Sequence, residues 1–420
     1  MKGVFIIISL LLCAGSVFAQ DEEKSTQLGE AVVKAARVVD EIDGQTIYPT
    51  EAQRKATFDG YGILHLLALP GIRVDEAARS VTAIGGEGSV VLRINGIAVG
   101  RQEMISLDPK TISRIRFIDN PGVRYGEGVA YVIDIATRRT DLGFTLGVEA
   151  NPTLTAVQAD GAAYGKWRTG RHELSLSYNG GGYKLEGAQS TETADYTLND
   201  GSIYTIKRND ELTRRKQISN TAKLTYNWVD STAQVFQVSL SGSFNKTPGN
   251  RSVKAITDGW DCYTAMSTER GRGNSPVADL YYFRQITPRQ SITANAVGTY
   301  IFTKSYNYYD EGTAIINNVS GRSGSVLSEV IYENTLSPFT LSSGVNYRFK
   351  HTTNDYTGTA PAQTQMTNSA VYGFAEIKGR HKDFSYSLGA GGNYIHYRQS
   401  GHNYDYWTFC PKTTLAYRFK

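Results

Sequence analysis

From residue 141 to the C-terminal end, apolar and polar side chains alternate with a period of two. Because successive side chains of a β-strand point to opposite faces of a sheet, each alternating run predicts a strand with one apolar face. The runs last about ten residues, the length of a tilted strand that crosses a bilayer, whereas strands of soluble sheets average about five or six. Apolar members of these runs include Phe144, Leu146, Leu174, Leu176, Leu224, Trp228, Val238, Leu240, Ile292, Ala296, Val345, Tyr347, Leu388, Tyr394, Leu415 and Tyr417.

The positions between the apolar ones are mostly Ser, Thr, Asn, Gly, Arg and Lys, which suits the water-filled interior of a closed sheet. Tyr and Phe gather near run ends, as at 346–350 and 416–420, where aromatic rings can lie at the lipid headgroups. A soluble β-sandwich or propeller with a wet outer face is the alternative, but so many long one-faced strands would expose unpaired edges unless the sheet closed. We therefore expect a mainly β protein whose larger part, residues 140–420, is an antiparallel transmembrane β-barrel.

Residues 45–139 have a mixed α+β pattern. The stretch FDGYGILHLLALPG predicts a helix with Ile63, Leu66 and Leu67 on one face, ended by Pro70 and Gly71. The stretch VVLRINGIAV predicts a β-hairpin, since Asn95 and Gly96 both tolerate the positive φ of a tight turn.

The second half of this region predicts two further strands. Asp108 followed by Pro109 predicts a helix start, with one short turn before a strand at residues 115–118. A last strand, YVIDIATR, follows a segment at 120–128 that is rich in turn residues. We expect that segment to be the corner where the chain passes from the compact region into the barrel wall.

The first residues resemble a secretory signal peptide. Lys2 gives a positive start, residues 4–12 are apolar, and Val17-Phe18-Ala19 is a small-x-small cleavage signal. An uncleaved membrane anchor is the alternative, but the apolar run is shorter than the ~20 residues of a spanning helix. We expect residues 1–19 to be removed on export.

Composition narrows the class of protein. The sequence has 27 Tyr, 15 Phe and 42 Gly against 11 Pro, a balance that suits strands better than helices. After the signal, no run approaches 18 apolar residues and the mean hydropathy is −0.34, which excludes spanning helices there. Lys plus Arg is 44 and Asp plus Glu is 40, so the charge gives no argument for a nucleic-acid partner.

The residues that could carry other chemistry are scattered. Cys262 and Cys410 lie outside any CxxC spacing, so the sequence predicts neither a metal site nor a cofactor. The sequence does not decide whether these two cysteines form a disulfide. No Ser-rich elbow or acidic pair singles out one of the later histidines, so we predict no catalytic residues and no enzyme. These histidines are His172, His351, His381, His396 and His402.

Four segments of the mixed region, in order and at normal spacing, resemble the plug domain of TonB-dependent outer-membrane receptors. They are LPGIRV (69–74), VLRINGIAV (91–99), ISRIRFIDNPGVRYGEG (112–128) and VIDIATRR (132–139). The residues at the plug-motif positions are Pro70, Gly71, Asn95, Gly96, Asn120, Pro121, Gly122, Tyr125 and Gly126. The sequence departs from the family pattern at Ala130-Tyr131, where Gly-Gly is common, and at Asp134 and Arg124.

The resemblance extends to a TonB box upstream of the plug. The stretch LGEAVVKAARV contains Glu30, Ala31, Val32, Val33 and Lys34 as the candidate contacts to a TonB-type energy transducer in the periplasm. An extended apolar pair between charges can add as a strand to a partner sheet. The alternative is that this stretch is the first plug strand or a linker.

The resemblance implies an outer-membrane receptor, in contact with outer-membrane lipid, that binds and imports a large or scarce solute gated by its plug. The implied organisation is a signal peptide at 1–19, a periplasmic extension at 20–44, a plug at 45–139 and a barrel at 140–420. The plug loops expected to face outward hold three candidate substrate contacts, Arg79, Arg101 and Gln102. The solute, whether iron chelate, vitamin or glycan, is not readable from the sequence.

The number of strands that the chain can form does not agree with the family that it resembles. Residues 140–420 give about 12 to 14 strands, whereas plugged transporters of this class have about 22. We therefore expect an incomplete barrel in a truncated member of the family. The alternative function is a truncated or non-transporting surface β-barrel with a structural or adhesive role.

Overall fold

The computed structural model describes residues 37–41, 43–84, 88–119, 121, 125, 128–138, 142–153, 155–230, 233–259 and 261–417. The predicted signal peptide and the predicted TonB box, Glu30 to Lys34, lie outside the described residues. None of the described helices has the length and apolar character needed to cross a membrane.

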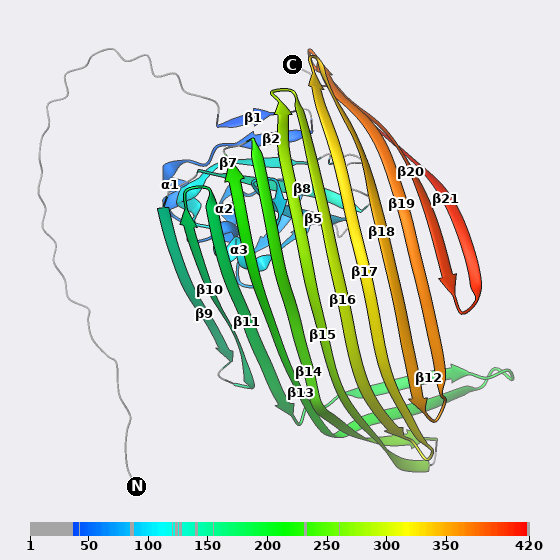
Figure 1. The fold of residues 1–420 in the computed structure, drawn as a ribbon. Helices are drawn as coiled ribbons and strands as arrows, with labels where there is room; N and C mark the ends of the chain where they lie inside the picture. The colour runs from blue at the N-terminus through cyan, green and yellow to red at the C-terminus, as the bar shows by residue number, and fades with distance from the viewer. Residues whose placement is uncertain are drawn as a thin grey trace, which may run out of the picture. The chain divides into compact units, whose positions relative to one another are not determined.

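Residues 37–138, which we call the plug, form a small α/β region around a six-stranded sheet (Figure 1). Its helical segments are α1 (Glu51–Lys55), α2 (Gly60–Leu67), α3 (Arg101–Ile105) and the 3₁₀ turn η1 (Pro109–Thr111). Its strands are β1 (Val38–Asp40), β2 (Gly44–Ile47), β3 (Ile72–Asp75), β4 (Ser80–Ala83), β5 (Ser89–Ile94), β6 (Ile97–Ala98), β7 (Ile112–Ile118) and β8 (Val129–Thr137). The sheet order is β1-β2-β7-β8-β5-β6, with β5 and β8 parallel, and β3 and β4 form a separate hairpin.

The plug core lies between this sheet and the helices. The buried side chains that make it are Ile47, Tyr61, Ile63, Leu64, Leu69, Ile72, Met104, Leu107, Ile112, Ile115, Phe117, Ile133 and Ile135. The predicted helix begins at an Asp59 cap, but its predicted apolar face was wrong in part because Leu64 is fully buried and Leu66 is 44% exposed. A helix of two turns has too few positions to define a stripe, so packing against the sheet and Met104 decides which side is buried.

The predicted helix start at Asp108 and Pro109 is confirmed, but the predicted start of the following strand at residue 115 was wrong, because β7 already begins at Ile112. The Asp108 side chain accepts a hydrogen bond from the Lys110 amide at 2.9 Å, η1 makes one turn, and β7 follows directly. The expected corner at 120–128 was wrong, because it connects β7 to β8 and both strands belong to the plug sheet. The chain leaves the plug only after Thr137, since β8 must first pair with both β7 and β5.

Residues 142–417, which we call the wall, form a thirteen-stranded antiparallel sheet. The strands are β9 (Leu142–Thr153), β10 (Val157–Thr169), β11 (His172–Glu186), β12 (Thr191–Thr197), β13 (Ile203–Asp230), β14 (Gln234–Asp258), β15 (Asp261–Thr287), β16 (Gln290–Asp310), β17 (Ala314–Leu336), β18 (Phe339–Gly358), β19 (Ala362–His381), β20 (Phe384–Gln399) and β21 (His402–Tyr417). Each strand pairs with the next along the chain, except that β12 pairs only with β13 and β11 passes directly to β13. Strands β9 and β21 end the order.

The register of the wall joins the apolar positions of the separate strands into one face. Leu176 lies opposite Leu224, and Leu224 lies opposite Leu240 on the next strand. These three side chains are 57%, 42% and 54% exposed, so the apolar face is turned outward. The predicted one-faced strands are confirmed. Their predicted length was wrong, since β13 to β19 run for 20 to 28 residues and continue beyond the apolar positions.

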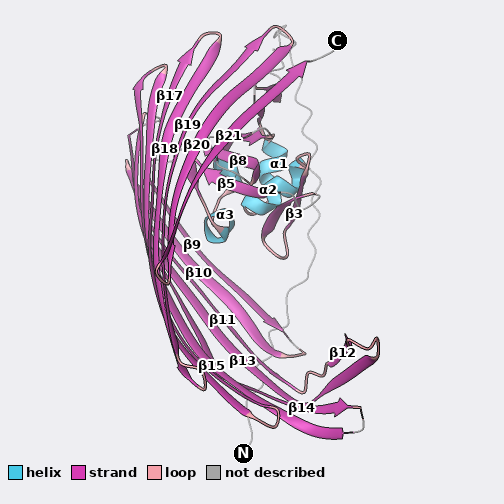
Figure 2. Cartoon of the chain, turned by 90° about the vertical axis from the view of Figure 1, so that its right-hand side faces the viewer, coloured by secondary structure: helices cyan, strands magenta, loops and turns pink. Residues whose placement is uncertain are grey.

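The plug lies on the concave face of the wall, near the end where the C-terminal strand finishes, and β12 lies at the opposite end (Figure 2). We call the face toward the plug the inner face and the other the outer face. Cys262 in β15 and Cys410 in β21 are not joined by a disulfide, and five strands of the sheet separate them.

Candidate functional site

Three basic side chains of the inner face hold the plug. The Lys223 ammonium on β13 forms an ion pair with the Glu103 carboxylate of α3. Lys378 on β19 pairs with Asp43 at 3.4 Å, and Arg380 donates to the Glu41 carbonyl at 2.7 Å and to the Asp40 carbonyl at 3.4 Å. The contacts therefore fix opposite parts of the plug, the α3 helix and the β1–β2 edge.

The plug edge carries its own charge cluster. Arg116 on β7 pairs with Glu41 at 2.8 Å and with Asp43 at 3.0 Å. These two carboxylates raise the pKa of the Arg116 guanidinium above its ordinary value, against the opposing effect of burial. Asp43 is 8% exposed and bridges Arg116 to Lys378, so one buried carboxylate connects the plug sheet to the wall.

The α3 contact has a defined charge state. Burial acts to raise the pKa of the Glu103 carboxyl, but the charge and hydrogen bond of Lys223 hold it below its ordinary value. Glu103 also accepts from the Gly100 amide at 3.0 Å, which caps the short helix. The same side chain thus starts α3 and docks it against the wall.

The plug-motif turn at Asn95 and Gly96 has the predicted geometry, with φ of 53° and 82°. The Asn95 amide donates to the Thr137 hydroxyl at 2.9 Å and its carbonyl accepts from the Thr137 backbone at 3.0 Å. The Gly96 amide donates to the Asp134 carboxylate at 2.9 Å. The Gly96 amide needs a side-chain oxygen as its acceptor, and Asp134 supplies one just as the Asn that is usual in the family would.

Pro70 and Gly71 precede β3, and Gly71 has a φ of 73°. A Cβ added to Gly71 would lie 2.1 Å from the hydroxyl oxygen of Tyr131, so the glycine makes room for this ring. Tyr131 in turn stacks on Phe117 with ring centroids 5.5 Å apart. Tyr131 replaces a family glycine, and the close approach to Gly71 is how the plug accommodates it.

The remaining motif positions are only partly described. Pro121 is buried, and the Tyr125 hydroxyl accepts from Arg93 at 3.4 Å. Asn120, Gly122 and Gly126 lie outside the described residues.

The three candidate substrate contacts have different surroundings. Arg79 pairs with Asp59, and Arg101 is exposed at the start of α3. Gln102 is 8% exposed, and its amide atoms have no hydrogen-bond partner among the described residues. The short helix α3 begins at Arg101, and its buried residues are Gln102 and Met104.

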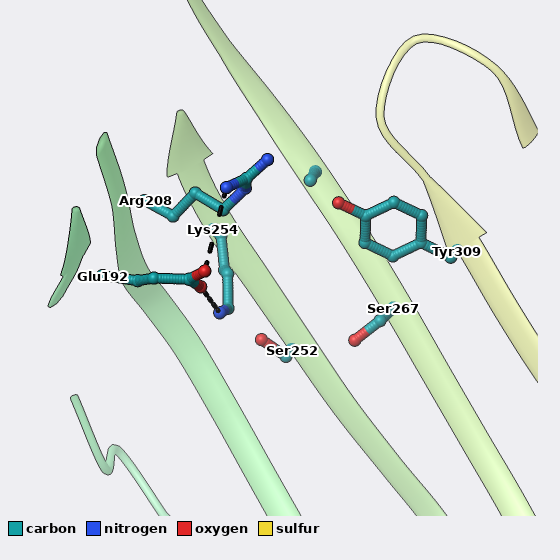
Figure 3. Close-up of a pocket in the computed structure, with 7 residues that line it drawn as sticks. Glu192, Arg208, Ser252, Lys254, Ser267 and Tyr309 are labelled. Carbon is teal, nitrogen blue, oxygen red and sulfur yellow. Dashed lines mark ion pairs between the residues drawn. The ribbon is translucent and has the colours of Figure 1, made fainter. Parts of the chain in front are cut away.

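A pocket of about 400 Å³ lies on the inner face beside β12, at the end of the wall away from the plug. Figure 3 shows the side chains that line it. The residues that line it are Glu192, Arg208, Ser252, Lys254, Ala265, Ser267 and Tyr309. Glu192 forms ion pairs with Lys254 at 3.7 Å and with Arg208 at 3.9 Å, and Arg208 also pairs with Glu311 at 3.4 Å. The pocket therefore offers two cations, a shared carboxylate and hydroxyl groups to a polar ligand.

Sequence reasoning missed these pocket residues. They come from five strands, β12 to β16, and none of Arg79, Arg101 and Gln102 is among them. Period-two alternation could assign each to a face, but only the register puts them at one level of the sheet. Among the described residues, no group of His, Cys, Asp and Glu is arranged to hold a metal ion.

No protein-family model and no curated protein matches the sequence. Among solved structures, the chain is similar to the copper transporter OprC, with 12% identity, a TM-score of 0.50 and coverage of 88% of this chain and 59% of OprC. It is also similar to the ferric yersiniabactin uptake receptor FyuA from Yersinia pestis, with 9% identity, a TM-score of 0.39 and coverage of 90% and 79%. A third is the alcaligin outer-membrane receptor FauA from Bordetella pertussis, with 11% identity, a TM-score of 0.35 and coverage of 88% and 80%.

The chain spans 59% of the length of OprC, and the likeness between the two is one of fold. Both the plug sheet and the long antiparallel wall take part, since 88% of this chain is covered. The predicted fold class, a small α+β plug followed by a large antiparallel sheet, is confirmed. The chain therefore has a fold like that of OprC, and its plug motifs resemble those of the TonB-dependent outer-membrane receptors.

Proposed function

We propose that this chain forms the plug and part of the wall of an outer-membrane receptor that binds a large or scarce solute and imports it when the plug is displaced. The observation that carries the proposal is the docking of the plug on the inner face through Lys223, Lys378 and Arg380. These are polar contacts, which water can replace when the plug moves. A structural or adhesive surface protein would have no use for such a plug.

The solute would first meet the pocket at the far end of the inner face. Its lining is charged and hydroxylated, which favours a solute rich in hydrogen-bonding groups. From there the inner face leads toward the plug. The proposal assigns Arg208, Lys254 and Tyr309 as solute contacts in place of Arg79, Arg101 and Gln102.

Energy would reach the plug through the segment at 28–38. We propose that Val32 and Val33 add as a strand to a TonB-type protein, which then pulls on the plug through β1.

Val33→Pro tests this step. Proline removes a backbone donor and fixes φ, so crosslinking of the chain to the TonB-type protein in intact cells should fall several-fold. Val33→Ala keeps the donor and is the matched control, expected to crosslink like wild type. Equal crosslinking in all three proteins would contradict the assignment of the TonB box, and both variants should still fractionate with the outer membrane.

A further inference from the structure

A groove of about 830 Å³ lies on the wall, over strands β14 to β18. Its floor consists of small residues of the outer face, Pro276, Ala278, Gly298 and Gly324, and its sides include Leu240, Tyr300, Val326 and Phe349. A Cβ added to Gly298 would meet no atom within 4 Å, so the glycine leaves open space. The groove is an apolar slot in the part of the wall that faces outward.

One end of the groove carries positive charge. Arg322 lines it, beside His351, whose ring is held by the Thr367 hydroxyl at 2.9 Å. Arg322 lies opposite Phe302, two residues from Lys304 on the same face. Lys304 lies opposite Arg272, and Arg272 lies opposite Lys246. Four basic residues thus form a row across the adjacent strands β14 to β17.

The row lies where the apolar face ends. Lys246 follows the exposed Phe244 by two positions, and Lys304 follows Phe302 in the same way. The Lys304 ammonium is 5.6 Å from the centroid of the Phe302 ring. Aromatic side chains of a membrane sheet lie at the level of the headgroups, and basic side chains just beyond them reach the headgroup phosphates. The groove is then at acyl-chain depth and the row at phosphate depth, on the side of the membrane away from the plug.

The charge of the row is not neutralised by the protein. All four side chains are exposed, and none makes an ion pair with a carboxylate among the described residues. Like charges on directly opposed positions of neighbouring strands destabilise a sheet. An anion bound across the row would remove that repulsion.

We propose that the groove and the row of Lys246, Arg272, Lys304 and Arg322 bind one phosphorylated lipid of the outer leaflet. An acyl chain lies in the groove, and the phosphates contact the row. This inference rests on the outer-membrane location in the proposed function, but it concerns the outer face and involves neither the plug nor the solute pocket.

The test measures lipid binding by the full chain, purified from outer membranes in a mild detergent, by native mass spectrometry. Three probes are titrated: lipid A with both phosphates, lipid A with its phosphates removed, and inorganic phosphate. Wild type should bind one copy of phosphorylated lipid A. Lys304→Gln combined with Arg322→Gln should weaken this binding roughly twenty-five-fold, since each basic residue near an anionic surface contributes about fivefold. The control, Arg348→Gln with Lys350→Gln, removes two charges from the inner face of β18 and should bind like wild type.

A second pair of variants tests the groove. Gly298→Leu fills the floor and should weaken binding of phosphorylated lipid A while leaving the row unchanged. Gly373→Leu is the matched control, because a Cβ there also meets no atom within 4 Å but the residue is outside the groove. Each variant is used only if it migrates as a folded, heat-modifiable species.

Equal binding of the phosphorylated and dephosphorylated lipids, or wild-type binding by the row variant, would overturn the proposal. Complete displacement of lipid A by inorganic phosphate would also overturn the proposal, because the site would then bind a phosphate ion without binding an acyl chain. A protein that is absent from the outer membrane would instead contradict the proposed function, so the two failures are distinct.

Discussion

Gly96 stands at the tip of a turn that is fixed from two sides. Its amide is bound by Asp134, and its carbonyl accepts from the Arg93 guanidinium at 2.7 Å. A Cβ added to Gly96 would also lie 3.4 Å from the hydroxyl of Tyr281, a side chain of wall strand β15. That distance is an ordinary van der Waals contact, so the positive φ of the turn, and not the wall, is what requires a glycine here.

Gly96→Val should strain the plug and leave the wall intact. A β-branched residue at a φ of 82° is expected to cost on the order of 1–3 kcal/mol. Limited proteolysis of outer-membrane fractions should show faster cleavage within residues 45–138 than in wild type, with unchanged cleavage of the remainder. If the variant plug is as resistant as wild type, this turn does not bear on plug stability. Gly170→Val is a control, since Gly170 also has positive φ but lies in a wall turn.

The Glu103–Lys223 pair gives plug docking a pH dependence. Because the pKa of Glu103 is below its ordinary value in the folded protein, the pair stabilises docking at neutral pH, and this contribution is lost as the pH falls through that lowered pKa. Protease resistance of residues 100–107 should therefore be kept at the ordinary pKa of a glutamate and drop only at a more acidic pH. Glu103→Gln should remove this pH-dependent drop and should lower the protease resistance of residues 100–107 at pH 7. If the variant shows an equally large drop in protease resistance at acidic pH, the pH dependence belongs to another group.

At the scale of elements, the wall covers an edge of the plug sheet that would otherwise be open. β1 is an edge strand, and Arg380 of β19 binds the carbonyls of Asp40 and Glu41 beside it. An unpaired edge can add other strands, so a covering side chain protects it. The same edge is the part of the plug nearest in sequence to the predicted TonB box, and we propose that it opens first.

Arg380→Ala should loosen this edge alone. Cleavage at residues 37–47 should rise several-fold, while residues 60–138 keep their resistance because the core between the helices and the sheet is untouched. Arg348→Ala is the matched control, as it removes an arginine from the inner face of the neighbouring strand β18. Uniform loosening of the whole plug would show that Arg380 supports the domain and not its edge.

At the scale of the whole molecule, the described wall has an apolar outer face, a polar inner face and a plug on the inner side. Thr225 and Ser239 are buried on the inner face and hydrogen-bonded to each other at 3.3 Å, while Leu224 and Leu240 beside them face outward. This is the reverse of a soluble sandwich, whose apolar faces are turned toward each other. The outer face needs lipid to cover it.

The mature chain should accordingly fractionate with the outer membrane of a bacterium with two membranes. Release should need detergent and should not follow washing with high salt, because burial of an apolar face is not screened by ions. A soluble periplasmic protein serves as the marker for leakage. Recovery of the chain with that marker, without detergent, would contradict the outer-membrane location.

The sequence by itself determined the features that depend on local periodicity and backbone chemistry. Alternation predicts the faces of the wall strands, Asn95–Gly96 predicts its turn, and Asp108–Pro109 predicts the start of η1, because each depends on neighbours within a few residues. The plug motifs, read as a resemblance, gave the fold.

Only the tertiary structure decided which residues meet. Glu192, Arg208, Lys254 and Tyr309 are far apart in the chain and come together through strand register, which a period of two leaves undetermined. The same holds for the four bases of the outer row and for Lys223 beside Glu103. Leu66 and Gln102 were misjudged because short helices carry too little periodicity to show their buried side, so the sheet and the wall that pack against them made that choice.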